Sequence, residues 1–284
     1  MRVLFVGDVF ATPGMHAARA FLRAKRDAYD FVIVNGENAA GGFGLTRKHF
    51  QTLRNAGADV VTLGNHAFDQ ADAADLLEET PHLLRPLNYP PGTPGLGAAI
   101  HEVPGHGRIC VAQVMGRVFM EPLDDPFRAL DALIDGLPDD VPLVVDVHAE
   151  ATSEKKVLGW HLAGRAAAAI GTHTHVATAD ETLMDGTAYL TDVGMTGVEA
   201  SSIGMAFEDV HARFRDFRKR RFRPAEGAAT VRAVEIDIRG TRARSIRRLR
   251  WRADGAHDDG NDGDDQAAPS VAGALGTERA GEGR

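Results

Sequence analysis

Cysteine is nearly absent from this sequence, and long apolar runs are missing. Cys110 is the single cysteine in 284 residues, which excludes an intrachain disulfide. It lies inside the apolar run 109–114, where a free thiol behaves as a small hydrophobic side chain, so we expect it in the core. No apolar stretch approaches the roughly 18 residues that a membrane-spanning helix needs, and the N-terminal residues show no signal-peptide pattern. We therefore expect a cytoplasmic protein without a membrane-spanning segment.

Net charge is small over most of the chain. The formal charge is −8, and residues 253–284 contain six Asp, two Glu and two Arg, or −6, which leaves −2 for residues 1–252. The tail has too little apolar surface to offset its chain entropy. We expect one domain over residues 1–252 and an acidic tail, disordered or weakly ordered, over residues 253–284. The tail by itself predicts no partner.

Strand-like and helix-like segments alternate through residues 1–195. This alternation predicts βα units and a largely parallel central sheet. Thr46 fits the N-cap of a helix that runs to about Ala56, and Pro126 fits the first position of a helix that runs to about Leu137. These elements predict an α/β fold.

The later part of the chain shows a different pattern. Five prolines and three glycines in residues 80–97 predict an ordered surface loop. From residue 228, apolar and polar side chains alternate on both sides of Gly240-Thr241, which predicts two antiparallel strands. The fold we expect is a layered α/β sandwich whose later strands are antiparallel.

Side chains able to bind a metal follow several β-rich runs, at the point where each run stops. The runs are residues 3–6, 31–34, 60–63 and 143–147. Open α/β sheets place their ligands at the carboxyl ends of strands, so we expect these side chains to meet. The candidate metal ligands are Asp8, Glu37, Asn38, Asn65, His148, His173 and His175.

These residue types suit a site with two metal ions. Two cations roughly 3.5 to 4 Å apart can deliver a hydroxide and hold the phosphoryl oxygens of a phosphate ester. Glu37 could place one carboxylate oxygen on each ion. In an extended segment His173 and His175 would share one face, so both rings could point into one pocket. Three imidazoles favour a first-row transition metal over calcium, without choosing among iron, manganese and zinc.

His66 follows the candidate ligand Asn65 directly. If Asn65 binds a metal, the adjacent side chain points elsewhere, towards the substrate. Because histidine titrates near neutral pH, the His66 ring could protonate the leaving oxygen. The alternative is a ring that fixes its loop through a backbone carbonyl.

Six ordered segments carry a resemblance to a known family. They are Gly7-Asp8-Val9, residues 35–40, Gly64-Asn65-His66, and residues 146–155, 171–176 and 191–197. Over about residues 1–250 the sequence resembles the YmdB-like bacterial metallophosphoesterases of the calcineurin-like superfamily. That superfamily usually opens with Asp-x-His and bridges its metals with Asp. Here Phe10 stands in place of the histidine and Glu37 in place of the Asp, and both are features of the YmdB-like branch.

The resemblance implies a fold, a ligand set and a reaction. The implied fold is a layered α/β/β/α metallophosphoesterase sandwich with central mixed sheets. The implied ligands are Asp8, Glu37, Asn38 and His175 for one ion, and Glu37, Asn65, His148 and His173 for the other. Iron or manganese is the implied metal, with zinc as an alternative. The implied reaction is hydrolysis of small cyclic nucleotides, 2′,3′-cyclic or 3′,5′-cyclic, by in-line attack of a metal-bridging hydroxide with His66 as proton donor.

Two other functions stay open at this point. The same cluster could serve a phosphomonoesterase or nucleotidase. Alternatively, the metal site could be structural and the chain a regulatory RNA- or protein-binding module, because residues 213–223 place seven basic residues among three phenylalanines. For this strip we favour a helix that buries Phe214, Phe217 and Phe222 and leaves the charges in solvent. The sequence does not indicate an oligomeric state.

Two more features could contact a phosphate. The glycine-rich residues 39–44 could let backbone amides approach one, although a turn before the helix at Thr46 is the interpretation we favour. Arg117 could clamp a phosphate, but a surface position is the default for arginine.

Overall fold

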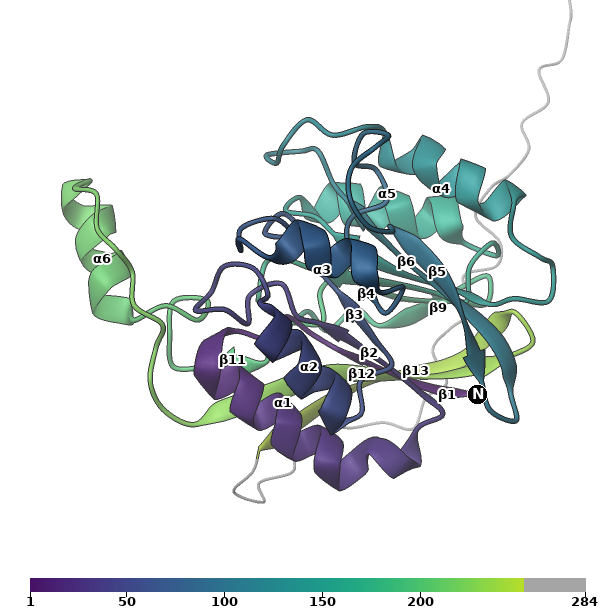
Figure 1. The fold of residues 1–284 in the computed structure, drawn as a ribbon, viewed down its shortest axis with the longest axis horizontal. Helices are drawn as coiled ribbons and strands as arrows, with labels where there is room; N and C mark the ends of the chain where they lie inside the picture. The colour runs from purple at the N-terminus through teal and green to yellow at the C-terminus, as the bar shows by residue number, and fades with distance from the viewer. Residues whose placement is uncertain (253–284) are drawn as a thin grey trace, which may run out of the picture.

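Two β-sheets pack face to face, and helices cover their outer faces (Figure 1). The computed structural model describes residues 1–252; the predicted acidic tail lies outside the described residues. The helices over the first sheet are α1 (Ala11–Lys25), α2 (Arg47–Ala56) and α3 (Ala73–Glu79). Those over the second are α4 (Pro126–Asp135) and α5 (Thr152–Leu162). The α/β/β/α order of layers confirms the predicted fold class.

The first sheet has seven strands in the order β11-β12-β1-β2-β3-β4, with β13 beside β12. Strands β1 to β4 are parallel, whereas β12 is antiparallel to β1, β11 and β13. The bounds are β1 Arg2–Val6, β2 Phe31–Asn35, β3 Val60–Thr62, β4 Leu83–Leu84, β11 Gly197–Val198, β12 Ala229–Arg239 and β13 Arg242–Arg252. A short 3-10 turn, η1 (Arg26–Ala28), leads from α1 towards β2.

The second sheet has six strands in the order β5-β6-β7-β8-β10-β9. Its four central strands are parallel, and β5 and β9 are antiparallel edges. The bounds are β5 Ala98–Val103, β6 Gly107–Met115, β7 Leu143–His148, β8 Ala168–Thr172, β9 Thr182–Met184 and β10 Thr187–Leu190. The largely parallel strands that the alternation predicted are divided between two sheets, so strands that are apolar on both faces are covered by the other sheet on one side and by helices on the other.

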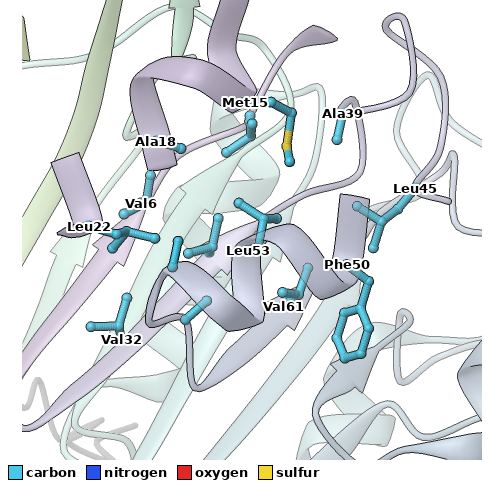
Figure 2. Packing of buried hydrophobic residues seen from close by; sticks show 14 of the residues in the cluster. Val6, Met15, Ala18, Leu22, Val32, Ala39, Leu45, Phe50, Leu53 and Val61 are labelled. Carbon is cyan, nitrogen blue, oxygen red and sulfur yellow. The ribbon is translucent and has the colours of Figure 1, made fainter. Parts of the chain in front are cut away.

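Alternate residues of each central strand enter different layers of the core. In β1, Val3 and Phe5 face the second sheet, while Leu4 and Val6 face the helices. Figure 2 shows Ala18 and Leu22 of α1 beside Val6, and Leu53 of α2 beside Val61, in the layer between helices and sheet. Because strand side chains alternate with period 2, each strand ties two layers together. The strand ends are thereby held at fixed positions.

Several local predictions are confirmed. Thr46 caps α2, and its side chain accepts a hydrogen bond from the backbone N–H of His49. Pro126 begins α4, which ends at Asp135, slightly before the expected end. The antiparallel finish is present as β12 and β13, and Cys110 is buried. The expected surface loop over residues 80–97 is wrong in part, because it contains the buried strand β4.

The basic strip over residues 213–223 does not form the predicted helix face. Helix α6 (Phe207–Asp216) ends before Phe217, which has a φ of 55°. Phe214 and Phe217 are 73% and 80% exposed, whereas Phe222 packs against a small cluster around Phe10. In Figure 1 helix α6 stands apart from both sheets, at the far left. The helix therefore has too few neighbours to bury the phenylalanines.

Residues 1–252 contain no helix that is both long and apolar enough to cross a membrane. The expected cytoplasmic location stays a prediction.

Gly171 of β8 provides a test of the packing between neighbouring strand ends. A Cβ atom at this position would overlap the carbonyl group of Thr191. We expect Gly171→Ala to lower the free energy of unfolding by about 3 kcal/mol, because backbone cannot move aside as a side chain can. Urea unfolding measures the change. Gly136→Ala is the control, since a Cβ there would meet its nearest atoms at 3.8 Å; equal stability of the two variants would contradict this packing.

Candidate metal centre

The predicted metal ligands converge where strands of both sheets end. The first sheet contributes the residues that follow β1, β2 and β3, which are Asp8, Glu37, Asn38 and Asn65. The second sheet contributes the last residue of β7 and two histidines after β8, which are His148, His173 and His175. The structure brings all seven side chains together at the seam between the sheets.

The first ligand group surrounds the Nε2 atom of His148. This atom lies 3.0 Å from Glu37 Oε1, 3.0 Å from Asn65 Oδ1 and 3.1 Å from His173 Nδ1. One ligand atom from each of Glu37, His148 and His173 lies within 4.8 Å of the others. First-row metal ions bind such atoms at about 2.0 to 2.2 Å, so one cation could contact all of them.

The second group shares Glu37 with the first. Asn38 Nδ2 lies 3.1 Å from Glu37 Oε1 and 3.1 Å from His175 Nε2. His175 Nε2 lies 3.8 Å from Asp8 Oδ1. The oxygen and the NH₂ group of a side-chain amide are nearly the same size. Rotation of the Asn38 amide group by 180° would therefore place its oxygen where Nδ2 now lies, facing a metal.

The charges at this seam fit a cation. Asp8 is fully buried, and its Oδ1 has no hydrogen-bond partner within the described residues 1–252. Burial raises the pKa of Asp8, since a buried carboxylate is costly unless a cation or a proton neutralises it. The donors are carboxylate and amide oxygens with three imidazoles, the mixture that suits first-row transition metals.

The Glu37–His148 pair sets the protonation of the centre. Burial lowers the pKa of His148, but the negative carboxylates nearby, above all Glu37, raise it overall to about 9. Burial likewise raises the pKa of Glu37, and the neighbouring imidazoles lower it overall to about 2. Without a metal, Glu37 is therefore ionised and His148 protonated at neutral pH.

A buried chain of hydrogen bonds orients His148. Its Nδ1 lies 2.8 Å from Thr172 Oγ1, and that hydroxyl donates to Asp146 Oδ1 at 2.6 Å. Because the single hydroxyl proton is used for Asp146, Nδ1 of His148 donates to Thr172. The ring is thereby fixed with Nε2 towards Glu37, the arrangement that metal-binding histidines need.

A buried ion pair holds the loop that carries the other two histidines. Lys155 Nζ lies 2.7 Å from Asp192 Oδ2 and donates to the carbonyl oxygen of Thr172 at 2.5 Å. Asp192 Oδ2 accepts further hydrogen bonds from Thr174 N and Oγ1 at 3.1 and 2.7 Å. Removing one partner of a buried ion pair is strongly destabilising. Because Asp192 binds both Lys155 and Thr174, the ion pair holds the backbone of Thr174, between His173 and His175, in place.

His173 and His175 reach the site by a geometry that differs from the prediction. We expected an extended segment, but φ is 92° at His173 and 64° at His175. His173 packs against His148, whereas His175 Nδ1 donates to the carbonyl oxygen of Ile203 at 2.9 Å and Nε2 faces Asn38. The two rings therefore serve different ligand groups. Non-glycine residues in the left-handed region are strained, and such strain is common at functional sites.

His66 faces a cavity of about 440 Å³ that opens onto the centre. Its lining includes the candidate ligands Glu37, Asn38, His173 and His175. The backbone N–H of His66 lies 3.4 Å from Glu37 Oε2, and its Nδ1 lies 2.7 Å from Asp69 Oδ2. With Nδ1 bound to Asp69, Nε2 is the ring nitrogen available to a substrate.

The family model described as YmdB-like protein matches residues 4–249. The chain belongs to the YmdB-like family. The match includes every residue of the two ligand groups and His66. Family membership and the cluster of Glu37, His148 and His173 together indicate the use of a divalent metal ion.

Relatives of this YmdB-like chain include both curated proteins and solved structures. The 2′,3′-cyclic-nucleotide 2′-phosphodiesterase of Bacillus subtilis is 46% identical over 243 residues, which cover 84% of this chain and 91% of that protein. A hypothetical protein from Thermus thermophilus superposes with a TM-score of 0.85 at 52% identity, covering 89% of this chain and 99% of that one. A novel phosphatase from Mycoplasma pneumoniae gives a TM-score of 0.82 at 32% identity, covering 89% and 93%.

Some residues that contact the candidate ligands or their loop in this YmdB-like chain received no role in the sequence analysis. Lys155, Thr172 and Asp192 support the ligands from behind, but nothing in their local sequence marks them as buried. The matched segments 146–155, 171–176 and 191–197 contain all three, so the resemblance was the only available signal. Arg117 lies 3.3 Å from Asp125 on the surface, which fits the default interpretation.

Gly64, beside the centre, allows a test of metal binding in which no candidate ligand residue is replaced. A Cβ atom at Gly64 would overlap Glu37 Oε2 and His148 Nε2. We expect Gly64→Ala to weaken metal affinity about 100-fold, at the upper end of the effects seen when ligands are misplaced. Metal content by mass spectrometry and fold by circular dichroism are the measurements. Gly136→Ala is the control, and full metal content in Gly64→Ala would refute the assignment.

The raised pKa of His148 predicts the pH dependence of metal binding. Below about pH 9 a metal must displace a proton from His148, so affinity should rise about tenfold per pH unit between pH 6 and 8. Titration calorimetry in buffers of different ionisation enthalpy should show at least one proton released at pH 7. Affinity that does not change with pH would contradict the protonated Glu37–His148 pair.

Proposed function

We propose that this chain is a metal-dependent phosphodiesterase of small cyclic nucleotides, with 2′,3′-cyclic phosphates as its main substrates. The observation that carries the proposal is the meeting of two ligand groups at Glu37, at one end of a cavity of about 440 Å³. The Bacillus subtilis relative, 46% identical, is named for this reaction. Its similarity over nearly the whole domain supports the same reaction class here.

The number of ligands supports two ions in the proposed enzyme. Seven side chains exceed the three or four protein ligands of a usual zinc-type site. Glu37 Oε1 lies 3.0 Å from His148 Nε2 and 3.1 Å from Asn38 Nδ2, between the groups. Two bound ions would supply an acidified water and neutralise phosphoryl oxygens. Iron or manganese, with zinc as an alternative, suits this mixture of oxygen and nitrogen donors.

His66 is the proposed proton donor. Asp69 holds Nδ1 of the ring, so a proton carried on Nε2 can pass to the ester oxygen that leaves phosphorus. For a 2′,3′-cyclic phosphate, an oxygen from water bonds to phosphorus as the bond between phosphorus and O2′ breaks, and protonation of O2′ yields a 3′-phosphate. The substrate therefore lies with its ribose on the His66 side of the cavity.

A phosphomonoesterase is the second candidate. A Mycoplasma pneumoniae relative, 36% identical, is named a putative phosphatase/phosphodiesterase, and a solved structure from the same organism is named a phosphatase. The RNA-binding alternative has less support. Arg220 and Arg223 of the basic strip pair with Asp216 and Asp209, which reduces the positive charge open to a nucleic acid.

Substitution of His66 tests the proposed function. We expect metal-loaded wild-type protein to hydrolyse 2′,3′-cyclic AMP and to lose activity on chelation. His66→Gln should lower kcat about 100- to 10,000-fold, the range for loss of a general acid, with unchanged metal content. His16→Gln, an exposed histidine outside this cavity, is the control.

Each part of the proposal has its own contrary result. A metal-loaded wild type that hydrolyses no phosphodiester would overturn the function, and an active His66→Gln would overturn the role of His66. Faster turnover of p-nitrophenyl phosphate than of bis-p-nitrophenyl phosphate would favour the phosphomonoesterase.

A further inference from the structure

The cavity beside the metal centre has an apolar side that the chemistry of phosphate hydrolysis does not use. Its polar lining includes four candidate metal ligands and His66, as described above, together with Glu150, Thr174 and Ser202. The remaining lining includes Phe43, Met205, Val210, Phe214 and Phe222. An apolar cavity with a few polar groups at one end is the usual form of a small-molecule site. This wall, which we call the aromatic wall, faces the same space as the ligands.

Phe43 is exposed at a fixed position in the aromatic wall. Its ring is 47% exposed and lies edge-on to His66, with ring centroids 5.2 Å apart at 89°. The loop that carries it is closed by a hydrogen bond from Ala40 N to Gly44 O at 2.9 Å. Gln70 Nε2 also donates to the carbonyl oxygen of Phe43 at 2.6 Å. A large apolar side chain held in solvent by such a loop is available for recognition.

Helix α6 supplies another part of the aromatic wall. Val210 joins the small cluster with Phe10 and Met205, which attaches the helix to the body. Phe214, one turn further along, lines the cavity and stays largely exposed. The helix thus presents an aromatic ring at the cavity without burying it.

We propose that the aromatic wall, through Phe43 and Phe214, binds the nucleobase of a substrate with a single phosphate. This inference rests on the proposed function and specifies its substrate class. Bases stack on aromatic side chains because every base has a π-face. The cavity of about 440 Å³ lies within the range of small-ligand sites. A base on the wall would keep the ribose near His66, which contacts Phe43 directly.

The charge of the cavity limits the substrate further. No lysine or arginine occurs among the residues that line it, within the described part of the chain. A second phosphate would therefore find no cation besides the metal ions, and Glu150, which also lines the cavity, would repel it. The site is thus suited to cyclic mononucleotides, and nucleoside polyphosphates and longer RNA ends are disfavoured.

A substrate that lacks a base separates this binding role from catalysis. We compare adenosine 2′,3′-cyclic phosphate with methyl riboside 2,3-cyclic phosphate on metal-loaded protein. Phe43→Ala and Phe214→Ala should each raise KM for the adenosine compound about tenfold, within the usual effect of removing one stacking residue. With Phe214→Ala, kcat and both constants for the base-free compound should stay as in wild type. With Phe43→Ala, whose ring packs against His66, the KM for the base-free compound should stay as in wild type. Phe214→Tyr should behave as wild type.

Phe217→Ala is the matched control. Phe217 follows the same helix and is even more exposed, but it does not line the cavity. The positive φ at position 217 strains the backbone equally with phenylalanine or alanine, because both residues carry a Cβ atom. Both substrates should show wild-type constants with this variant.

Three results would overturn the inference. The first is an equal rise in KM for both substrates, which means that the wall only supports the fold. The second is no change for either substrate. The third is a change in native mass of Phe214→Ala by light scattering without a base-specific effect, which means that a second copy covers the ring. If wild type hydrolyses neither compound, the proposed function has failed, and calorimetric binding of adenosine 3′-phosphate to wild type and Phe214→Ala decides the base site.

Discussion

The buried carboxylate of Glu37 is the constraint on which the site depends. It follows a strand of the first sheet, yet the imidazole 3.0 Å away belongs to His148 of the second sheet. A charge without solvent requires a counter-charge at contact distance, so the two sheets must pack at a fixed separation and register. The apolar layer between them, which includes Val3, Phe5 and Val144, supplies that rigidity. The Glu37–His148 contact thus links the packing of the two sheets to the candidate metal site.

Much of the centre could be predicted from the chain because its residues occupy positions with a simple physical signature. A β-rich run that ends in Gly-Asp, Gly-Glu-Asn or Gly-Asn-His places a ligand at a strand end, and parallel strands share that edge. β-rich runs that end in a metal-binding side chain, with or without a preceding glycine, therefore located candidate ligands as far apart in sequence as Asp8 and His148. This pattern could not divide the strands between two sheets, because a strand that is apolar on both faces looks the same beneath a helix or beneath another sheet.

The features that sequence patterns missed are those decided by tertiary contacts. The sequence does not indicate a positive φ at His173 or His175, because neither residue is glycine. This backbone conformation directs the two rings to separate ligand groups. Lys155 occurs in a helix as an ordinary polar residue, and only its ion pair with Asp192 explains its burial. The phenylalanine spacing near Phe214 suggested a buried face, but a helix can bury a face only where another element lies against it.

The pairing of β1 with β12 has a consequence for synthesis. Arg2 pairs with Asp237 and Val6 with Ala233, so β1 receives its antiparallel neighbour only after more than two hundred further residues have been translated. Until then β1 has an open edge, which is a template for wrong pairing. Folding dominated by such distant contacts is slow. The nascent chain can form the parallel strands β1 to β3 early, but the first sheet closes only after translation of the domain is almost complete.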